Sequence, residues 1–492
     1  MKITIPQYKG SAYPLLVLLM LAVALIAVRP ARVEWGGAVC VALTVPLCLW
    51  PLIQWWRGHD RSMPFIAAIG LFYLIWFVCQ PFLTDFIWRD GAIRLYRDGM
   101  ALPGNQLGTD AMVAMAGGIA MLMIVLMGTA RWLNQRIRPV RFVGQPSVRL
   151  SIGLAVLALT GHFGGMLVSS RLGISSVEQL ANPLAFVGFG IPVFLAGSNQ
   201  IKRWWLIPLL GVLLPLKIVM GMESGNFIKV LMLPAFLVFL YLALNRRQAV
   251  VLLTIILVVG AVGYRPFRDF RDHVWFSKLS GKTLHPADYL ASMKFGLNLT
   301  FSAPMQLEAA VVDAPRSPFL GSLRETAKRV NAAVLFAQVH ALSPDTVPYW
   351  HGETLRPLLT SFIPRFLYAQ KPEERLGNEF GRRYVFIPAD NMNMAVNLPW
   401  LVEAYANFGL WGMLATMSVV GLTLAGLNAL LNSLSGQPLN MVIGSSVLFP
   451  LINQESNISL TCGNIVLLIA VLYVMARSVE WGYKALFRPA PD

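Results

Sequence analysis

The chain has 492 residues, of which 56% are hydrophobic and 13% are charged. Because an ordinary soluble protein has about 25% charged residues, this composition excludes a soluble globular protein and indicates a membrane protein. Lys and Arg outnumber Asp and Glu by 40 to 24. In a membrane protein this excess reports topology and contacts with anionic lipids or phosphates, so nucleic acid is not expected as a partner. The four cysteines form no C-x-x-C pair, which argues against a disulfide framework or a zinc site.

Twelve apolar runs approach the roughly 20 residues that a helix needs to cross a bilayer. They lie near residues 12–28, 35–55, 64–86, 111–130, 149–168, 182–198, 204–221, 226–244, 248–264, 402–430, 438–455 and 462–479. Arg29 and Arg32 follow the first run where a signal peptide would have small residues, so we expect this run to be retained as a helix. The sequence therefore predicts an all-α polytopic membrane protein with about twelve transmembrane helices.

The basic residues of the tails and short loops fall into two groups on alternate sides of these spans. One group has sixteen members: Lys2, Lys9, Arg57, Arg61, Arg131, Arg136, Arg138, Arg141, Arg149, Lys202, Arg203, Arg246, Arg247, Arg477, Lys484 and Arg488. The other has six: Arg29, Arg32, Arg89, Arg94, Arg97 and Arg171. Because Lys and Arg concentrate in cytoplasmic loops, this distribution predicts that both termini are cytoplasmic.

The same topology divides the chain into three parts. Residues 1–264 form spans one to nine, and residues 401–492 form spans ten to twelve and a cytoplasmic tail. Residues 265–400 lie between them on the outer face. This outer segment holds sixteen Lys and Arg and four of the six histidines, so we expect the chemistry of the protein here. Ser322 and Glu325 have the spacing of a capping box and precede apolar residues at helical spacing. The pattern predicts short amphipathic helices within the loop.

Three arginines leave the ninth span at positions i, i+3 and i+6, namely Arg265, Arg268 and Arg271. On a helix they fall on one face, with about 4.5 Å of rise between successive members. Guanidinium groups gathered in this way suit a diphosphate, because each offers a planar fork of donors and keeps its charge. Alternatively, they pair with Asp269 and Asp272 and bind lipid headgroups.

A second polar cluster extends from 349 to 372 and contains His351, Glu353, Arg356, Arg365 and Lys371. A histidine and a carboxylate can share the work of a general base, while cations neutralise a leaving group. The alternative interpretation is a solvated surface loop.

A third polar group begins the tenth span with Glu403, Tyr405 and Asn407. An acid at the head of a membrane helix is costly unless it is paired or close to water. Glu403 is therefore either part of an active site or a structural partner for a loop arginine. The polar residues 453–457 lie at the outer end of span eleven. We expect them to line one cavity together with Glu403, Tyr405 and Asn407.

The sequence does not contain the complete motifs of several other enzyme classes. The stretch 280–283 reads Ser-Gly-Lys-Thr like the end of a P-loop, but Phe276 replaces the first glycine. The sequence has no D-x-D, H-E-x-x-H or G-x-S-x-G motif. ATP hydrolysis and a carboxylate-held metal–nucleotide site are therefore not indicated, and we expect neither a cofactor nor a metal.

The order of the three groups resembles the oligosaccharide repeat-unit polymerase (O-antigen polymerase) family of bacterial inner membranes, which is related to the O-antigen ligases. The motifs that carry the resemblance are Arg265 to Arg271, Gly352-Glu353-Thr354, Ile363-Pro364-Arg365, Lys371-Pro372 and Glu403 to Gly409. They lie within roughly residues 200–430. In one departure, the turn before span eight reads Gly225-Asn226 with Lys229 nearby, where the family often has an arginine.

The resemblance implies a metal-independent glycosyltransferase that joins polyprenyl-diphosphate-linked repeat units into O-antigen or exopolysaccharide at the periplasmic face. It further implies contact with membrane lipids and with a chain-length regulator. His351 or Glu403 would be the base. The residues expected to bind diphosphate or sugar are Arg265, Arg268, Arg271, Arg356, Arg365, Lys371 and Tyr405.

Two other functions compete with this one. An O-antigen ligase uses the same donor but transfers the glycan to a lipopolysaccharide core. A polysaccharide or lipid transporter would place polar residues along a central pathway, whereas this chain gathers its charge in one outer segment.

Overall fold

The structure is a computed structural model that describes residues 13–30, 33–58, 63–84, 107–172, 175–223, 227–279, 291, 293–294, 318–361, 363, 368, 376–432 and 438–486. Every regular element within these ranges is helical. The protein is an all-α polytopic membrane protein, as predicted.

Described helices lie within each of the twelve apolar runs. Seven segments are long and apolar enough to cross a membrane: Trp35–Trp56, Thr109–Arg136, Val148–Ser169, Arg203–Met222, Arg246–Val274, Trp400–Leu431 and Ile458–Leu486. Shorter apolar helices cover the other five runs: Pro14–Ala27, Phe65–Val78, Ala181–Gly197, Val230–Leu242 and Leu439–Ile452. A further short apolar helix, Ala332–Leu342, lies inside the predicted outer segment.

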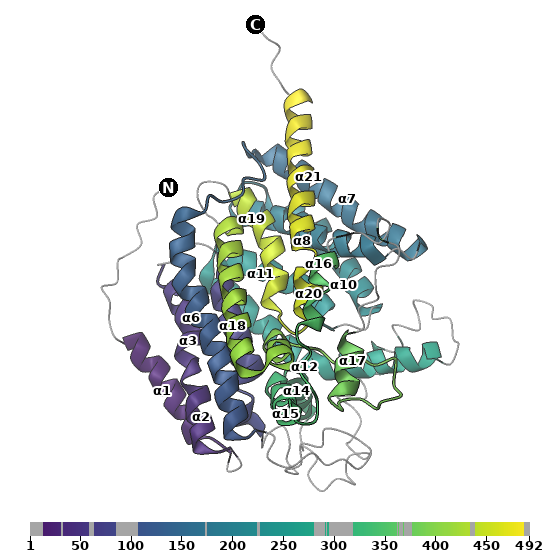
Figure 1. The fold of residues 1–492 in the computed structure, drawn as a ribbon. Coiled ribbons are helices and arrows are strands. Elements are labelled where there is room, and N and C mark those ends of the chain that lie inside the picture. The colour runs from purple at the N-terminus through teal and green to yellow at the C-terminus, as the bar shows by residue number, and fades with distance from the viewer. Residues whose placement is uncertain are drawn as a thin grey trace.

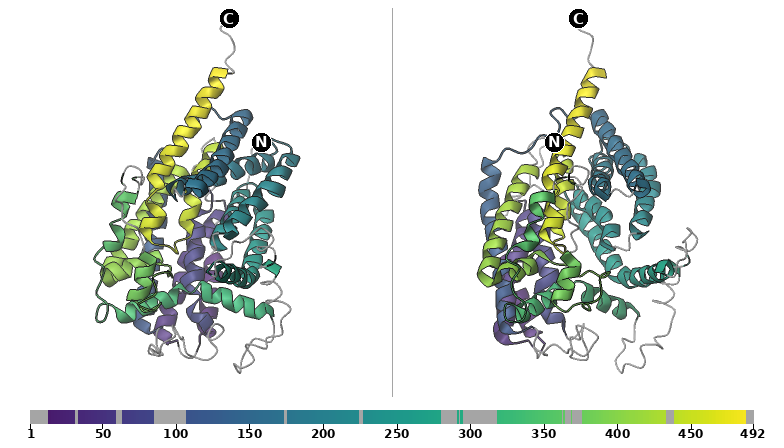
Figure 2. Two further views of the ribbon diagram at one scale, coloured as in Figure 1. Left: turned by 90° about the vertical axis from the view of Figure 1, so that its right-hand side faces the viewer. Right: turned by 45° about the vertical axis from the view of Figure 1, so that its right-hand side comes forward.

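The helices of the bundle are drawn in Figures 1 and 2. Those of the first half are α1 Tyr13–Ala27, α2 Trp35–Ala42, α3 Thr44–Trp56, α4 Phe65–Tyr73, α6 Thr109–Arg136, α7 Val148–Leu172, α8 Ser175–Gly197, α9 Leu206–Pro208 and α10 Leu214–Glu223. Those of the second half are α11 Phe227–Leu242, α12 Arg246–Leu279, α14 Pro318–Arg329, α15 Ala332–Leu342, α16 Leu358–Ser361, α17 Leu376–Arg383, α18 Trp400–Leu431, α19 Pro438–Leu448, α20 Ile458–Cys462 and α21 Ile465–Leu486.

Helices α6 and α18 lie side by side through the bundle (Figure 1). Gly421 of α18 permits this approach, because an added Cβ would lie 3.0 Å from the carbonyl oxygen of Leu122 on α6. Small residues at such contacts let membrane helices approach closely, which increases their van der Waals attraction. The pair therefore gives the head of α18 a rigid support.

One end of the bundle, here called the arginine-rich end, joins the α6–α7 turn to α19 and α21. Asn440 accepts a hydrogen bond from Val143 N–H at 2.9 Å, and the Glu480 carboxylate accepts one from Gly144 N–H at 3.0 Å. Twelve described basic residues lie at this end: Arg57, Arg131, Arg136, Arg138, Arg141, Arg149, Lys202, Arg203, Arg246, Arg247, Arg477 and Lys484. The predicted grouping of cations thus corresponds to a shared end in space, and the positive-inside rule predicts that this end faces the cytoplasm.

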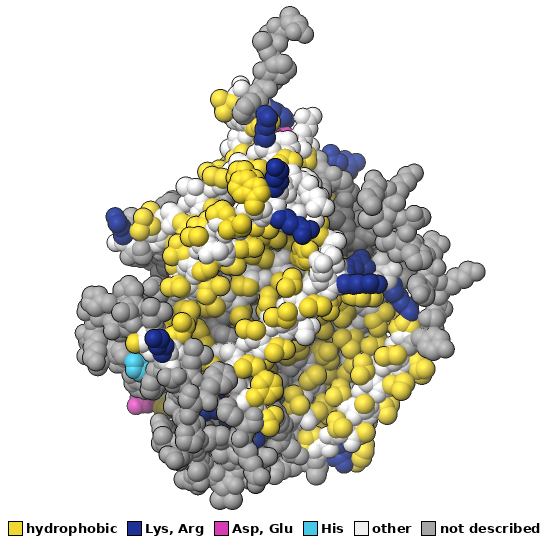
Figure 3. Space-filling view, turned by 180° about the vertical axis from the view of Figure 1, so that it is seen from behind, with side chains coloured by type: hydrophobic (Ala, Val, Ile, Leu, Met, Phe, Trp, Pro, Cys, Tyr) yellow, Lys and Arg dark blue, Asp and Glu magenta, His cyan; other side chains and the backbone are white. Residues whose placement is uncertain are grey.

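The opposite end, here called the loop end, carries α14, α15 and α17, which lie low in Figure 1. Between the two ends the back of the molecule is a broad hydrophobic surface (Figure 3). A face of this kind suits contact with lipid chains, which offer no hydrogen-bonding partners.

The predicted outer segment does not begin where the ninth span ends. Helix α12 continues without interruption through residue 265 to Leu279, so the predicted division at 264 falls inside a helix. Helix α15 is buried and apolar rather than amphipathic, with Ala333, Phe336 and Val339 each at most 1% exposed. The outer segment therefore contributes a core helix as well as surface helices.

The predicted capping box at Ser322 and Glu325 is wrong. Helix α14 already begins at Pro318, a residue that suits the first turn of a helix because its missing N–H is not needed there. Ser322 instead donates a hydrogen bond to the Val262 carbonyl oxygen of α12 at 2.5 Å. Both residues serve the packing of α14 on α12.

The arrangement of the two ends predicts the topology. Reporter fusions after residues 145 and 492 should report the cytoplasm, and a fusion after residue 340 should report the periplasm, because the cations cluster at the arginine-rich end. A periplasmic signal at 145 or a cytoplasmic signal at 340 would reverse the orientation and contradict this assignment.

Candidate functional site

Helix α18 is broken near its start, at the loop end of the bundle, at Gly409, whose φ of 66° and ψ of −162° are not helical. Only glycine adopts this conformation readily. A Cβ at this position would also lie 2.7 Å from the Tyr349 hydroxyl oxygen. The break frees backbone carbonyls of the preceding turn. Those of Ala406 and Asn407 accept hydrogen bonds from the N–H groups of Trp350 and His351, at 3.0 and 3.1 Å.

The Asn407 side chain reinforces this junction between α18 and the loop. Its Oδ1 accepts a hydrogen bond from Gly352 N–H at 2.9 Å, and its Nδ2 donates to Thr354 Oγ1 at 2.7 Å. Nδ2 also donates to the Glu403 carbonyl oxygen at 2.8 Å. Asn407 and Thr354 are both fully buried. The loop is therefore fixed to the head of α18 by side-chain and backbone hydrogen bonds.

This loop holds His351 in a left-handed backbone conformation, with a φ of 49°, followed by Gly352 with a φ of 85°. Left-handed conformations are uncommon for residues other than glycine and persist only where the surroundings enforce them. The His351 side chain is exposed, and its ring lies edge-on to Tyr349 with 6.5 Å between centroids. The junction thus directs an imidazole outward from the loop end.

Glu403 lies on the same face of α18 as Asn407, one turn earlier, and is fully buried. Its Oε2 accepts a hydrogen bond from Ile458 N–H at 2.6 Å, at the start of α20. The carboxylate therefore ties α18 to the turn that follows α19. This contact gives Glu403 a structural role at the site, while His351 is the group that solvent reaches.

Tyr405 faces the other way, toward α15. Its ring stacks on His340 with 5.2 Å between centroids and contacts Phe336 at the same centroid distance. Tyr349 approaches Tyr405 edge-on at 6.2 Å. Burial lowers the pKa of His340, an effect that the nearby Asp110 carboxylate partly opposes. The neutral imidazole is thus favoured in this aromatic cluster.

The three predicted arginines of α12 differ in their surroundings. Arg268 pairs with Glu325 of α14 and with Asp269 at 3.2 Å, and Arg271 pairs with Asp272 at 2.8 Å. Arg265 has no hydrogen-bond or ion-pair partner among the described residues, and its Nε is buried. Arg265 is therefore the member of this group whose charge is available to an anionic ligand.

An ion pair links these arginines to the head of α18. Arg329 at the end of α14 forms a bidentate contact with Glu455, whose side chain is 4% exposed. The adjacent Gln454 accepts hydrogen bonds from Tyr73 at 2.6 Å and, through its carbonyl, from Trp400 N–H at 3.2 Å. Sequence reasoning missed Arg329, although an isolated acid near the end of span eleven calls for a cation partner.

The structure thus brings together His351, Glu403 and Tyr405 at the head of α18, and it places Arg265, Arg268 and Arg271 on α12 at the same end of the bundle. Arg356 follows this loop, is exposed and has no partner among the described residues. Arg365 and Lys371 lie outside the described residues, so their predicted place in the site stays a prediction.

No family model, curated protein or solved structure matches this chain.

The chemistry available at this end consists of an exposed imidazole for proton transfer and an arginine, Arg265, that has no ion-pair partner among the described residues. Histidine is the side chain that most often serves as a general base in catalysis. A guanidinium group stabilises charge that develops on phosphate oxygens. Proton transfer and the stabilisation of phosphate charge are therefore the chemistry that these two residues can supply.

We predict that Asn407→Ala lowers the free energy of unfolding by about 3 kcal/mol, since three buried hydrogen bonds are lost at about 1 kcal/mol each. Chemical unfolding of the full chain in detergent measures this. Asn393→Ala is the matched control, because that side chain is exposed and makes no hydrogen bond among the described residues. Equal stability of the two variants would contradict the role of Asn407.

The ion pairs of Glu325 make the stability of the protein depend on pH. Burial tends to raise the pKa of Glu325, but Lys328 and Arg268 outweigh burial and hold that pKa below its ordinary value of 4.5. A carboxyl whose pKa is lowered by folding contributes stability above its unfolded pKa and loses it as the pH falls. Glu325→Gln should therefore be less stable than the wild type near neutral pH, and the difference should shrink below pH 4.5.

Unfolding midpoints measured across this pH range test the prediction. Glu353→Gln serves as the control, because Glu353 is exposed and has no described ion pair. A difference for Glu325→Gln that stays constant through acid pH would show that its ion pairs do not stabilise α14.

Proposed function

We propose that this protein is a bacterial inner-membrane glycosyltransferase that polymerises polyprenyl-diphosphate-linked oligosaccharide repeat units at the periplasmic face. One observation carries the proposal. Two motifs of the resemblance, at 352–354 and 403–409, lie about 50 residues apart in the sequence. Asn407 joins them directly, through its hydrogen bonds with Gly352 and Thr354.

In the proposed reaction the donor is the growing glycan on one lipid carrier. A hydroxyl oxygen of the acceptor, a single lipid-linked repeat unit, bonds to the anomeric carbon of the donor sugar. The bond from that carbon to the diphosphate oxygen breaks, and the polyprenyl diphosphate leaves with the electron pair. His351 takes the hydroxyl proton, and Arg265 stabilises the charge on the leaving group.

Other residues position these groups. Asn407 fixes the backbone that carries His351, and Glu403 anchors the head of α18 to α20. The exposed Arg356, together with the predicted Arg365 and Lys371, would contact phosphate. Tyr405 would hold the ring of Tyr349, which would contact the sugar. The proposed reaction needs no metal, and activity in excess chelator would support that part of the proposal.

We predict that Arg265→Gln reduces polymer formation by 10-fold or more without lowering the amount of protein in the membrane. The loss of a desolvated charge contact typically costs roughly 2–5 kcal/mol. Arg265→Lys should restore little activity if the contact is bidentate. Arg271→Gln is the matched control and should lose less activity, because Asp272 already pairs with that guanidinium.

Deletion of the gene in its own bacterium separates the three candidate functions. A strain without the polymerase should show surface lipopolysaccharide capped by one repeat unit and should accumulate lipid-linked single repeats. A strain without a ligase would show no repeat on the core and would store long lipid-linked chains. A strain without a transporter would retain single repeats on the cytoplasmic side.

Complementation then tests the residues. His351→Ala should leave the single-repeat phenotype of the deletion, while Glu353→Gln should restore long chains. Normal polymer from His351→Ala would remove this histidine from the role of base.

A further inference from the structure

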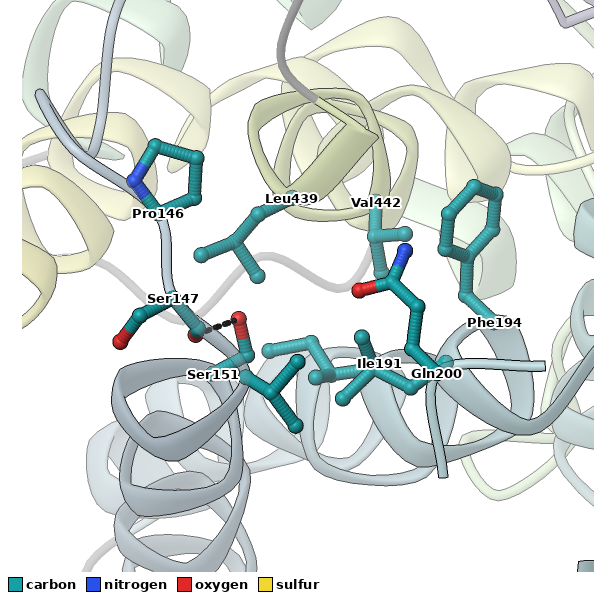
Figure 4. A pocket seen from close by; sticks show the side chains of 10 residues that line it. Pro146, Ser147, Ser151, Ile191, Phe194, Gln200, Leu439 and Val442 are labelled. Carbon is teal, nitrogen blue, oxygen red and sulfur yellow. Dashed lines mark hydrogen bonds between the residues drawn. The ribbon is translucent and has the colours of Figure 1, made fainter. Parts of the chain in front are cut away.

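A cavity lies at the arginine-rich end, far from the candidate site. It has a volume of about 310 Å³ and is bounded by the start of α7, the end of α8 and the start of α19 (Figure 4). This volume is at the lower end of the roughly 300–1,000 Å³ range of small-molecule pockets. None of the residues discussed for glycosyl transfer lines it.

The cavity is amphipathic. Its deep wall consists of Ile191, Phe194 and Val442, of which Ile191 and Val442 are each 1% exposed. Polar side chains border the cavity at Ser147 and Gln200, and the Gln200 amide turns toward Val442 across it (Figure 4). The polar border lies at the end of the bundle where headgroups of a bilayer would be found. A ligand that fits would be apolar at one end and polar at the other.

The charge beside this cavity indicates the polar part. Arg149 follows the lining residue Val148, and Lys202 and Arg203 follow the lining residue Gln200 by two and three positions. Successive Cα atoms are about 3.8 Å apart, so the Cα atoms of these three cations lie within about 11 Å of a lining residue. All three are exposed, and none has a hydrogen-bond or ion-pair partner among the described residues.

Three other cations at this end are already engaged. Arg246 donates to the Trp56 carbonyl oxygen at 2.8 Å, and Arg477 and Lys484 both pair with Glu480, at 3.0 and 2.9 Å. Glu480 is also the one acidic residue described at this end. Within the part of the chain that the structure describes, the three cations beside the cavity therefore have no carboxylate to neutralise them.

We propose that this cavity binds one acyl chain of an anionic phospholipid, whose phosphate lies at the mouth against Arg149, Lys202 and Arg203. The apolar wall accommodates the chain, and the cations select an anionic over a zwitterionic headgroup. The site is independent of the proposed glycosyl transfer, since it lies at the opposite end of the bundle.

Native mass spectrometry of the purified full chain in detergent tests this with phosphatidylglycerol and phosphatidylcholine of identical chains. The wild type should bind phosphatidylglycerol more tightly. The triple variant Arg149→Gln, Lys202→Gln, Arg203→Gln should lose roughly 100-fold in affinity for it, at about fivefold for each cation. The matched triple variant Arg136→Gln, Arg138→Gln, Arg247→Gln removes the same charge elsewhere at this end and should change affinity less than about threefold.

The apolar wall is tested separately. Ser151→Leu places a larger side chain in the cavity and should weaken the binding of both lipids. Inorganic phosphate in excess should not displace phosphatidylglycerol.

Equal losses of affinity in the two triple variants would show diffuse attraction to the basic end and overturn the proposal. Displacement by inorganic phosphate would show a site for free anions, which also overturns it. Because the triple variants alter exposed residues, they remain informative if Ser151→Leu fails to fold.

Discussion

Backbone groups within a membrane protein must find hydrogen-bond partners inside the protein, because lipid chains offer none. The break at Gly409 leaves carbonyls of α18 without their helical partners close to the outer end of a span. The loop that contains Trp350 and His351 supplies the missing donors. The conformation of the loop and the integrity of α18 thus depend on each other, and the site forms where they meet.

A second set of contacts holds this junction in place from the side. Helix α14 is joined to α12 by Arg268 and Glu325 and to the turn after α19 by Arg329 and Glu455. Both pairs are only partly buried, since the Arg268 and Arg329 side chains are 31% and 34% exposed. Their main effect is to fix the position of α12, and with it Arg265, relative to the head of α18.

Much of the architecture could be predicted from the sequence, because a spanning helix is encoded by an uninterrupted apolar run. The grouping of cations likewise predicted which helix ends share a side. The break at Gly409 could not be predicted, since a glycine in an apolar helix usually remains helical. The spacing of Ser322 and Glu325 gave a wrong start for helix α14, because capping-box spacing also occurs within helices. The helix begins at Pro318 instead.

The site was only partly predictable for a similar reason. His351, Glu403 and Arg265 were identified by residue type and position, but their different environments arise from contacts between distant segments. Arg329 and Glu455 are 126 residues apart in sequence. The burial of α15 in the core could not be predicted from the lengths of the apolar runs either. Its eleven residues are too few to span a bilayer, so this helix was not recognised as part of the bundle.

The central claim is that the loop end of this protein joins lipid-linked repeat units. The most direct measurement uses lipid-linked single repeats extracted from the deletion strain, supplied to the purified full chain in lipid nanodiscs. The account predicts a ladder of products that differ by one repeat, with one polyprenyl diphosphate released for each bond formed. Intact protein that leaves the single repeats unchanged, or that extends them equally well after His351→Ala and Arg265→Gln, would contradict it.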